Sequence, residues 1–300
     1  MKLAQYCRDF VESQAKLSNF KSSYVLTLNQ LINWYIEPAA GEIPMSKITL
    51  LDLKKIPAYM REQNICVEKI NATIGFINRA LADAAEDGGP LKRLLVLKKI
   101  QKSTKEVKKE VEPFTDAEIG KIMEASTRHL KPVLMMLAHT GMRPCEALAL
   151  KWKDIDFSRK CIKVCHAIVH GEVSTTKTGA TREIPMTDAL EAVLLTHDHV
   201  PKSDYVFNKM SRYGSGPMDQ EHVWVSWKKI LAKAGVKHRP VYLLRHSFAT
   251  DLMRKDVPLA AVSRLLGHTN IKTTSDRYVK LTTLSLDDVS KFHAAMEARV

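Results

Sequence analysis

A small set of side chains in this chain could bind and transfer a phosphate group. Most are basic, and they stand beside residues that typically begin or end an element: Arg143, Lys177, Arg245, His268 and Tyr278. Arginine carries a planar, permanently charged fork that matches two phosphate oxygens, so two arginines could hold a phosphate without a metal ion. Each residue alone also has an ordinary explanation, because surface cations are usually solvated and tyrosines are often half buried.

Several other kinds of site have no support in the sequence. It contains neither a GxxxxGK[ST] loop nor a GxGxxG turn, so nucleotide binding is not indicated. Cys161, Cys165 and His166 could suit a metal ion, but they fall within one predicted strand and no second ligand pair follows. We therefore expect the two cysteines to pack in the core, and we expect no metal site.

The elements around the candidate residues follow from capping signals and alternation. Thr115 and Glu118 form a capping box before a helix, and the apolar helix over 132–139 should stop at Gly141. Pro144 suits the first turn of the next helix. Alternating residues predict strands over 161–169, 172–176 and 181–186, with a turn over 177–180, and helices dominate afterwards. Arg143 then begins a helix, and Lys177 lies at a hairpin tip.

The first hundred residues are predicted to form a bundle of about four helices. Ile70, Ile74, Ile77 and Leu81 recur at helical spacing, and the run Asp87-Gly-Gly-Pro90 is a strong stop. A lysine-rich stretch follows, with too few apolar residues to bury itself. We expect a helical domain over 1–97, a basic linker over 98–112 and a second domain over 113–300. The linker is either simply solvated or lies along a phosphate backbone.

The charge of the chain points to a polyanionic partner. Lys and Arg number 46 against 33 Asp and Glu, a net charge of +13. The excess is spread along the sequence, because residues 1–112 hold 18 basic and 13 acidic residues and residues 113–300 hold 28 and 20. Nucleic acid is the usual partner of a folded protein that is basic throughout, although a basic enzyme without such a partner is an alternative.

Four motifs, which follow one another in sequence order, resemble those of a known protein family. They are TGMRP-x-E-x-x-x-L, TKTG-x-x-RE-I-P, LRHSFAT and LLGH…TT…RY, and they span roughly residues 113–285. Together they resemble the catalytic domain of the tyrosine recombinases, the phage integrase family. The resemblance implies a mostly α fold with a small antiparallel β-sheet in the C-terminal domain. Residues 1–97 are similar to the family's helical, SAM-like core-binding domain by helicity and position only.

The resemblance also implies roles for the candidate residues. Arg143 and Arg245 would clamp the scissile phosphate, and His268 would donate to one of its oxygens. Tyr278 would be the nucleophile that forms a covalent bond to the DNA 3′ end, and Lys177 would be the general acid for the leaving 5′ oxygen. The expected activity is that of a site-specific DNA recombinase that needs neither a metal ion nor ATP.

Two further positions follow from the same motifs. Glu146 resembles the acidic residue that would hold the geometry of the site. Tyr242 stands where the family usually has histidine, three residues before Arg245, and it could still hydrogen bond to the phosphate. Candidate DNA-binding residues outside the catalytic set are the linker lysines Lys98, Lys99, Lys102, Lys105, Lys108 and Lys109.

The resemblance implies double-stranded DNA as the partner. It implies no cofactor, and we expect no association with a membrane. We expect a homotetramer on two DNA sites, in the cytoplasm with the nucleoid. The amphipathic C-terminal helix over 286–300 is the candidate for exchange between subunits, and docking on its own domain is an equal alternative. Some members carry a further N-terminal domain for accessory sites. We do not expect it in this sequence, which leaves open whether such a domain has been trimmed. The sequence leaves the DNA target open, and it does not separate integration from excision or dimer resolution.

Two alternatives remain open. One is a strand-passing enzyme of the type IB topoisomerase kind, which uses similar chemistry. The other is a DNA-binding protein whose catalytic set is a relic, although all five residues stand at their expected places.

Overall fold

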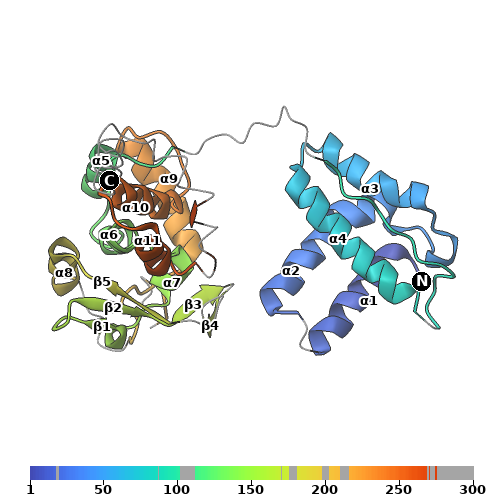
Figure 1. Cartoon of the computed structure of the whole chain (residues 1–300), viewed down its shortest axis with the longest axis horizontal. Coiled ribbons are helices and arrows are strands. Elements are labelled where there is room, and N and C mark those ends of the chain that lie inside the picture. Colours follow the sequence, from blue (N-terminus) through green and yellow to red (C-terminus); the bar gives the residue numbers. More distant parts are fainter. Residues whose placement is uncertain are drawn as a thin grey trace, which may run out of the picture. The chain divides into compact units, whose positions relative to one another are not determined.

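The computed structural model describes residues 1–17, 20–86, 88–101, 112–169, 171–175, 181–197, 203–209, 216–268, 270 and 274–275. The chain divides into two compact units, Met1–Glu110 and Val111–Val300 (Figure 1). As predicted, it is mostly helical, with small antiparallel sheets in the second unit only, as far as the described residues show. None of the helices in the described parts is both long and apolar enough to cross a membrane.

The first unit is a bundle of helices. Its elements are α1 (Leu3–Lys16), α2 (Ser22–Leu31), a π-helix (Ile32–Gly41), a short 3-10 helix (Met45–Lys47), α3 (Leu50–Glu62) and α4 (Val67–Ala84). Helix α4 packs against α1 and α3. Its predicted apolar face is confirmed, because Ile70, Ile74, Ile77 and Leu81 are all buried.

An extended segment after α4 is held on that helix by two asparagines. The side chain of Asn78 donates to the carbonyl of Leu97 and accepts from its N–H, both at 2.9 Å. Asn71 does the same with Ile100, at 2.9 and 2.8 Å. An asparagine amide can therefore pair with an extended chain much as another strand would. The segment, with exposed Lys98 and Lys99, is thereby fixed to the first unit.

The second unit is built from helices around a small group of strands. Its helices are α5 (Asp116–Ala125), α6 (Lys131–Thr140), α7 (Pro144–Leu148), a 3-10 turn (Trp152–Asp154), α8 (Asp188–Leu195), α9 (Gln220–Lys233), α10 (Leu243–Arg254) and α11 (Leu259–Leu266). The predicted capping box at Thr115 and the predicted start at Pro144 are both confirmed. Figure 1 shows the strands on one side of this unit, with α5, α6, α9 and α10 on the other.

The strands differ from the prediction at two points. They are β1 (Ile155–Asp156), β2 (Cys161–Val164), β3 (His166–Val169), β4 (Glu172–Thr175) and β5 (Arg182–Pro185). The predicted strand 161–169 is divided at Cys165, so that β2 pairs with β1 and β5 while β3 pairs with β4. The predicted hairpin between 172–176 and 181–186 is therefore wrong in the described residues. Glycine supplies the true turn between β3 and β4, at Gly171 with φ 82°.

This strand pairing fixes both ends of the connection that includes Lys177. Val164 lies opposite Arg182, and His166 lies opposite Thr175. The connection between β4 and β5 therefore begins and ends beside the same short stretch of chain around Cys165. Lys177 itself, like Tyr278 and the segment 286–300, lies outside the described residues.

The buried residues of β2 contradict the prediction that Cys161 and Cys165 pack in the core. Ile162 and Val164 are buried, and alternation along β2 places Cys161 on the opposite face, where it is half buried. Cys165 is also half buried. The prediction that both cysteines pack in the core is therefore wrong, because the aliphatic residues of the strand occupy that side.

Candidate functional site

Arg245, in the first turn of α10, is the most buried cation of the described residues, with 2% of its surface exposed. Its guanidinium donates to the carbonyls of Gly141 at 2.7 Å and Leu266 at 2.6 Å. These carbonyls follow α6 and end α11, so one side chain joins three helices. Burial, and after it the charge of Arg143, lower the pKa of Arg245 to about 10. The side chain is still a cation at neutral pH.

His268 lies against Arg245. Gly267 ends α11 with a left-handed φ of 66°, which turns the chain so that His268 follows directly. The Arg245 Nη2 atom donates to His268 Nε2 at 3.0 Å, and Nδ1 lies 2.8 Å from the Thr274 hydroxyl oxygen. Because a guanidinium can only donate, Nε2 acts as the acceptor and the ring proton sits on Nδ1. In this arrangement His268 is neutral, and it must gain a proton on Nε2 before it can donate from that atom.

Glu146 is the buried anion at the centre of the cluster, with 2% of its side chain exposed. It accepts from the backbone N–H of Arg143 at 2.9 Å and from Arg143 Nη1 at 2.8 Å. Burial raises the pKa of Glu146, but hydrogen bonds and charge from Arg182, and then from Arg143, outweigh burial and lower it overall. The carboxylate is therefore ionised at neutral pH, and it fixes Arg143 at the first turn of α7.

Arg182, the first residue of β5, is the member of the cluster that the sequence interpretation missed. Its guanidinium binds Glu146 through Nη2 at 2.7 Å and Nη1 at 3.3 Å, and its Nε donates to the carbonyl of Leu265 at 2.8 Å. The signal was the strand alternation: Arg182 shares a face with buried Ile184. An arginine at an inward position of a strand needs a buried partner.

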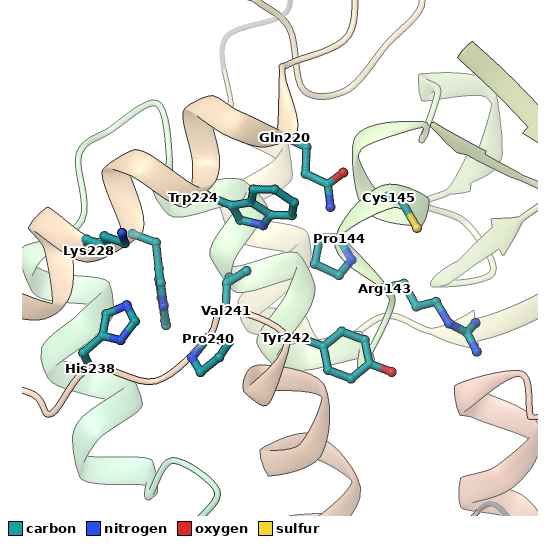
Figure 2. Close-up of a pocket in the computed structure, with 11 residues that line it drawn as sticks. Arg143, Pro144, Cys145, Gln220, Trp224, Lys228, His238, Pro240, Val241 and Tyr242 are labelled. Atoms are coloured by element: carbon teal, nitrogen blue, oxygen red, sulfur yellow. The ribbon is translucent and has the colours of Figure 1, made fainter. Parts of the chain in front are cut away.

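Tyr242 lies at the edge of the same cluster. It immediately precedes α10, is half buried, and its ring contacts His246 edge-on at 5.5 Å between centroids. Figure 2 shows its hydroxyl on the same side as the Arg143 guanidinium. This placement allows the hydrogen-bonding role that the sequence predicts, and nothing in the contacts requires it.

A cavity of about 490 Å³ opens beside Arg143 and Tyr242. Its wall is mostly apolar and comes from the start of α7, from α9 and from the segment before α10, with Pro144, Trp224, Trp227, Pro240 and Val241 as its main residues. Lys228 and His238 lie at the end away from Arg143 (Figure 2). Two cations, Arg143 and Lys228, therefore stand at opposite ends of an apolar hollow.

The structure brings together four of the predicted site residues, namely Arg143, Glu146, Arg245 and His268, and places Tyr242 next to them. With Arg182, the cluster holds three arginines and one carboxylate, and two of these arginines, Arg143 and Arg182, bind that carboxylate. This excess of positive charge favours an anionic ligand. Arg143 keeps 26% of its side chain exposed, so it can reach such a ligand. Of the linker lysines, Lys98 and Lys99 are exposed in the first unit, and Lys102, Lys105, Lys108 and Lys109 lie outside the described residues.

Comparison with known proteins gives matches to the phage integrase family. The model of the phage integrase family matches residues 112–284. A XerC-like tyrosine recombinase of Caldanaerobacter subterraneus subsp. tengcongensis is 30% identical over 275 residues, which cover 79% of this chain and 69% of that protein. Tyrosine recombinase XerA of Pyrococcus horikoshii is 28% identical over 282 residues, which cover 92% of this chain and 88% of that protein.

Solved structures with the same fold include two integrases. The Tn1549 transposon integrase, in complex with a circular intermediate DNA, matches 99% of both chains with a TM-score of 0.76 and 20% identity. A lambda integrase tetramer bound to a Holliday junction matches 93% of this chain and 77% of that one, with a TM-score of 0.72 and 16% identity. The fold predicted from the sequence motifs is thereby confirmed.

Proposed function

The chain belongs to the phage integrase family of site-specific tyrosine recombinases, and from that premise we propose that it cuts and rejoins DNA strands through a covalent 3′-phosphotyrosyl intermediate, without a metal ion or ATP. The observation that carries this proposal is the cationic cluster of Arg143 and Arg182, which bind Glu146, together with the buried Arg245. Its positive charge exceeds what one carboxylate can neutralise, which suits a phosphodiester whose negative charge grows in the transition state.

The proposed reaction starts with attack by the Tyr278 oxygen on the scissile phosphorus. The new phosphotyrosyl bond forms as the bond to the 5′ oxygen breaks, and Lys177 gives the leaving oxygen its proton. Arg143 and Arg245 hold the nonbridging oxygens. Resealing is the reverse: a 5′ hydroxyl from another strand attacks the phosphotyrosine, and the tyrosine leaves. The ester keeps the energy of the cut bond, so strand exchange needs no external energy source.

The contacts of His268 suggest how DNA entry would complete the site. In the structure its Nε2 accepts from Arg245. A phosphate that binds the Arg245 guanidinium would compete for that donor, and the nearby negative charge would favour a proton on Nε2. His268 would then change from an acceptor for Arg245 into a donor to the phosphate. Tyr242 would add a hydrogen bond on the other side.

Double-stranded DNA is the proposed substrate, and the two units would grip it together. The Tn1549 and lambda integrases were solved with DNA, one of them as a tetramer on a Holliday junction. We propose a homotetramer on two sites, with the segment 286–300 exchanged between subunits and the DNA of the nucleoid as the target. The proposed unit boundaries are 1–97 and 113–300, although the residues up to Ile100 are held on α4, and the lysines of 98–112 would contact the DNA backbone.

A suicide DNA substrate tests the proposal. Sites recovered by crosslinking and sequencing the bound DNA would be nicked near the cleavage position, so that the released end cannot religate. The wild-type protein should form a covalent adduct with DNA, and Tyr278→Phe should form none while it still binds. Recombination between two such sites separates a recombinase from the type IB topoisomerase alternative. Binding without any adduct in the wild-type protein would favour the relic alternative.

A further inference from the structure

The carboxylate of Glu146 is shared between two arginines with different surroundings. Arg143 is partly exposed and binds Glu146 through one guanidinium nitrogen and its own backbone N–H. Arg182 is 11% exposed, and its three guanidinium nitrogens all donate within the protein, two of them to Glu146 and one to the Leu265 carbonyl. Each nitrogen of the Arg182 guanidinium is therefore bound within the protein, and these bonds hold β5 against α7 and α11.

Glu146 carries one negative charge, whereas the two arginines that bind it carry two positive charges. If Glu146 faced Arg143 alone, the two would form a neutral pair, and a DNA phosphate would have to compete with a buried carboxylate for the guanidinium. Arg182 supplies a second cation to the same carboxylate. The positive charge of Arg143 then remains available to a phosphate at the exposed side of the cluster.

We propose that Arg182 is a positioning residue of the reaction: it neutralises Glu146, so that Arg143 can act on the scissile phosphate. This inference rests on the proposed function. It explains why an arginine stands at this place, because a lysine cannot bind both carboxylate oxygens in plane and a carbonyl at the same time.

Gly267 belongs to the same arrangement. A Cβ atom at this position would lie 2.9 Å from Arg182 Nη1 and 3.1 Å from its Cδ and Cζ atoms. The absence of a side chain at Gly267 therefore leaves room for the guanidinium beside the turn that leads to His268. Helix α11 packs on β5, and the contact between Gly267 and Arg182 lies at this packing.

The test measures single-turnover adduct formation on the suicide substrate at saturating DNA. Arg182→Gln should slow adduct formation by about 100-fold, the scale of one lost electrostatic contribution, with DNA affinity changed by less than about threefold. Arg182→Lys keeps the charge and should lose less than about 10-fold. The decisive variant is the double change Arg182→Gln with Glu146→Gln. It removes the anion together with its cation and should be at least about 10-fold faster than Arg182→Gln alone.

A second substrate distinguishes positioning of Arg143 from damage to the fold. DNA with a neutral methylphosphonate at the scissile position lacks the charge that Arg143 would meet. On this substrate Arg182→Gln should react within about threefold of the wild-type rate, as should the reference variant Arg143→Ala. The matched control is Arg159→Gln, which removes an exposed pair with Glu183, the neighbour of Arg182 in β5, and should change neither rate.

The outcomes separate the inference from the proposed function. Equal losses for Arg182→Gln on both substrates, with no recovery in the double variant, would overturn the inference while the wild-type adduct still supports the function. If Arg182→Gln does not fold, the comparison of Arg182→Lys with wild type on the two substrates decides: a defect of the same size on both contradicts the inference. A wild-type protein that forms no adduct would contradict the proposed function instead.

Discussion

Two cations of the first unit and one arginine of the second have opposite surroundings. In the first unit, Lys69 lies over the rings of Trp34 and Tyr35, and Arg79 lies over Phe20 and Tyr24, so their charges stay near solvent. In the second unit, Arg245 is buried and donates to helix-terminal carbonyls and a histidine. Burying a guanidinium requires a complete set of acceptors, whereas an exposed cation can exchange its partner at little cost. Losses in the second unit should therefore be much larger.

The largest effect is expected from Arg245→Gln. The change removes a buried cation and leaves the carbonyls of Gly141 and Leu266 without their donor. Adduct formation on the suicide substrate should fall by about 10³-fold, while DNA affinity in a fluorescence anisotropy assay should fall by less than about 10-fold. A variant with nearly normal adduct formation would show that Arg245 only holds the helices together.

The arginine cluster also shows which contacts of the site could be predicted from the sequence and which could not. The motifs with Gly141, Pro144 and Gly267 predict the helix ends that bring Arg143, Arg245 and His268 together, because glycine and proline act through local backbone geometry. The pairing of Arg182 with Glu146 joins residues 36 apart in the chain. Such contacts depend on strand pairing, and the division of the strand at Cys165 gave no local signal. The sequence also gave no indication that the asparagines of α4 bind the segment after the helix, because an amide on a helix has many possible partners.

The second prediction concerns Glu146→Gln, which leaves two arginines without their anion. The free energy of unfolding should fall by about 3 kcal/mol at pH 7, as for other buried ion pairs that lose one partner. The pKa of Glu146 is lowered in the folded state. Its contribution to stability is therefore fully present above the unfolded pKa, near the ordinary 4.5, and is lost as the pH falls through the folded value.

Urea unfolding of wild type and Glu146→Gln between pH 7 and pH 3 measures this difference. The gap between the two proteins should be constant down to about pH 5 and should close at lower pH. A gap that does not change with pH would mean that Glu146 stabilises the fold through packing and not through its charge.

A smaller effect is expected in the first unit from Asn78→Ala. The change removes both hydrogen bonds that hold Leu97 on α4, so unfolding of this unit should become easier by about 1–2 kcal/mol. Amide hydrogen exchange at Leu97 should accelerate strongly, and exchange at Ile100, held by Asn71, should accelerate less. Unchanged exchange at Leu97 would show that burial of Leu95 and Leu97 is enough to hold the segment.

The smallest effect is expected from Lys69→Met, which keeps the length of the side chain and removes its charge. Lys69 Nζ lies 5.0 Å from the centroid of the Tyr35 ring and donates to its hydroxyl at 3.2 Å. The free energy of unfolding should change by about 0.5–1 kcal/mol, the scale of a cation near an aromatic face. Chemical denaturation of wild type and Lys69→Met, beside the exposed Lys54→Met as control, measures it. A loss of unfolding free energy as large as that of Glu146→Gln would contradict the contrast drawn above, because it would show that the charge of Lys69 is essential for the stability of the first unit.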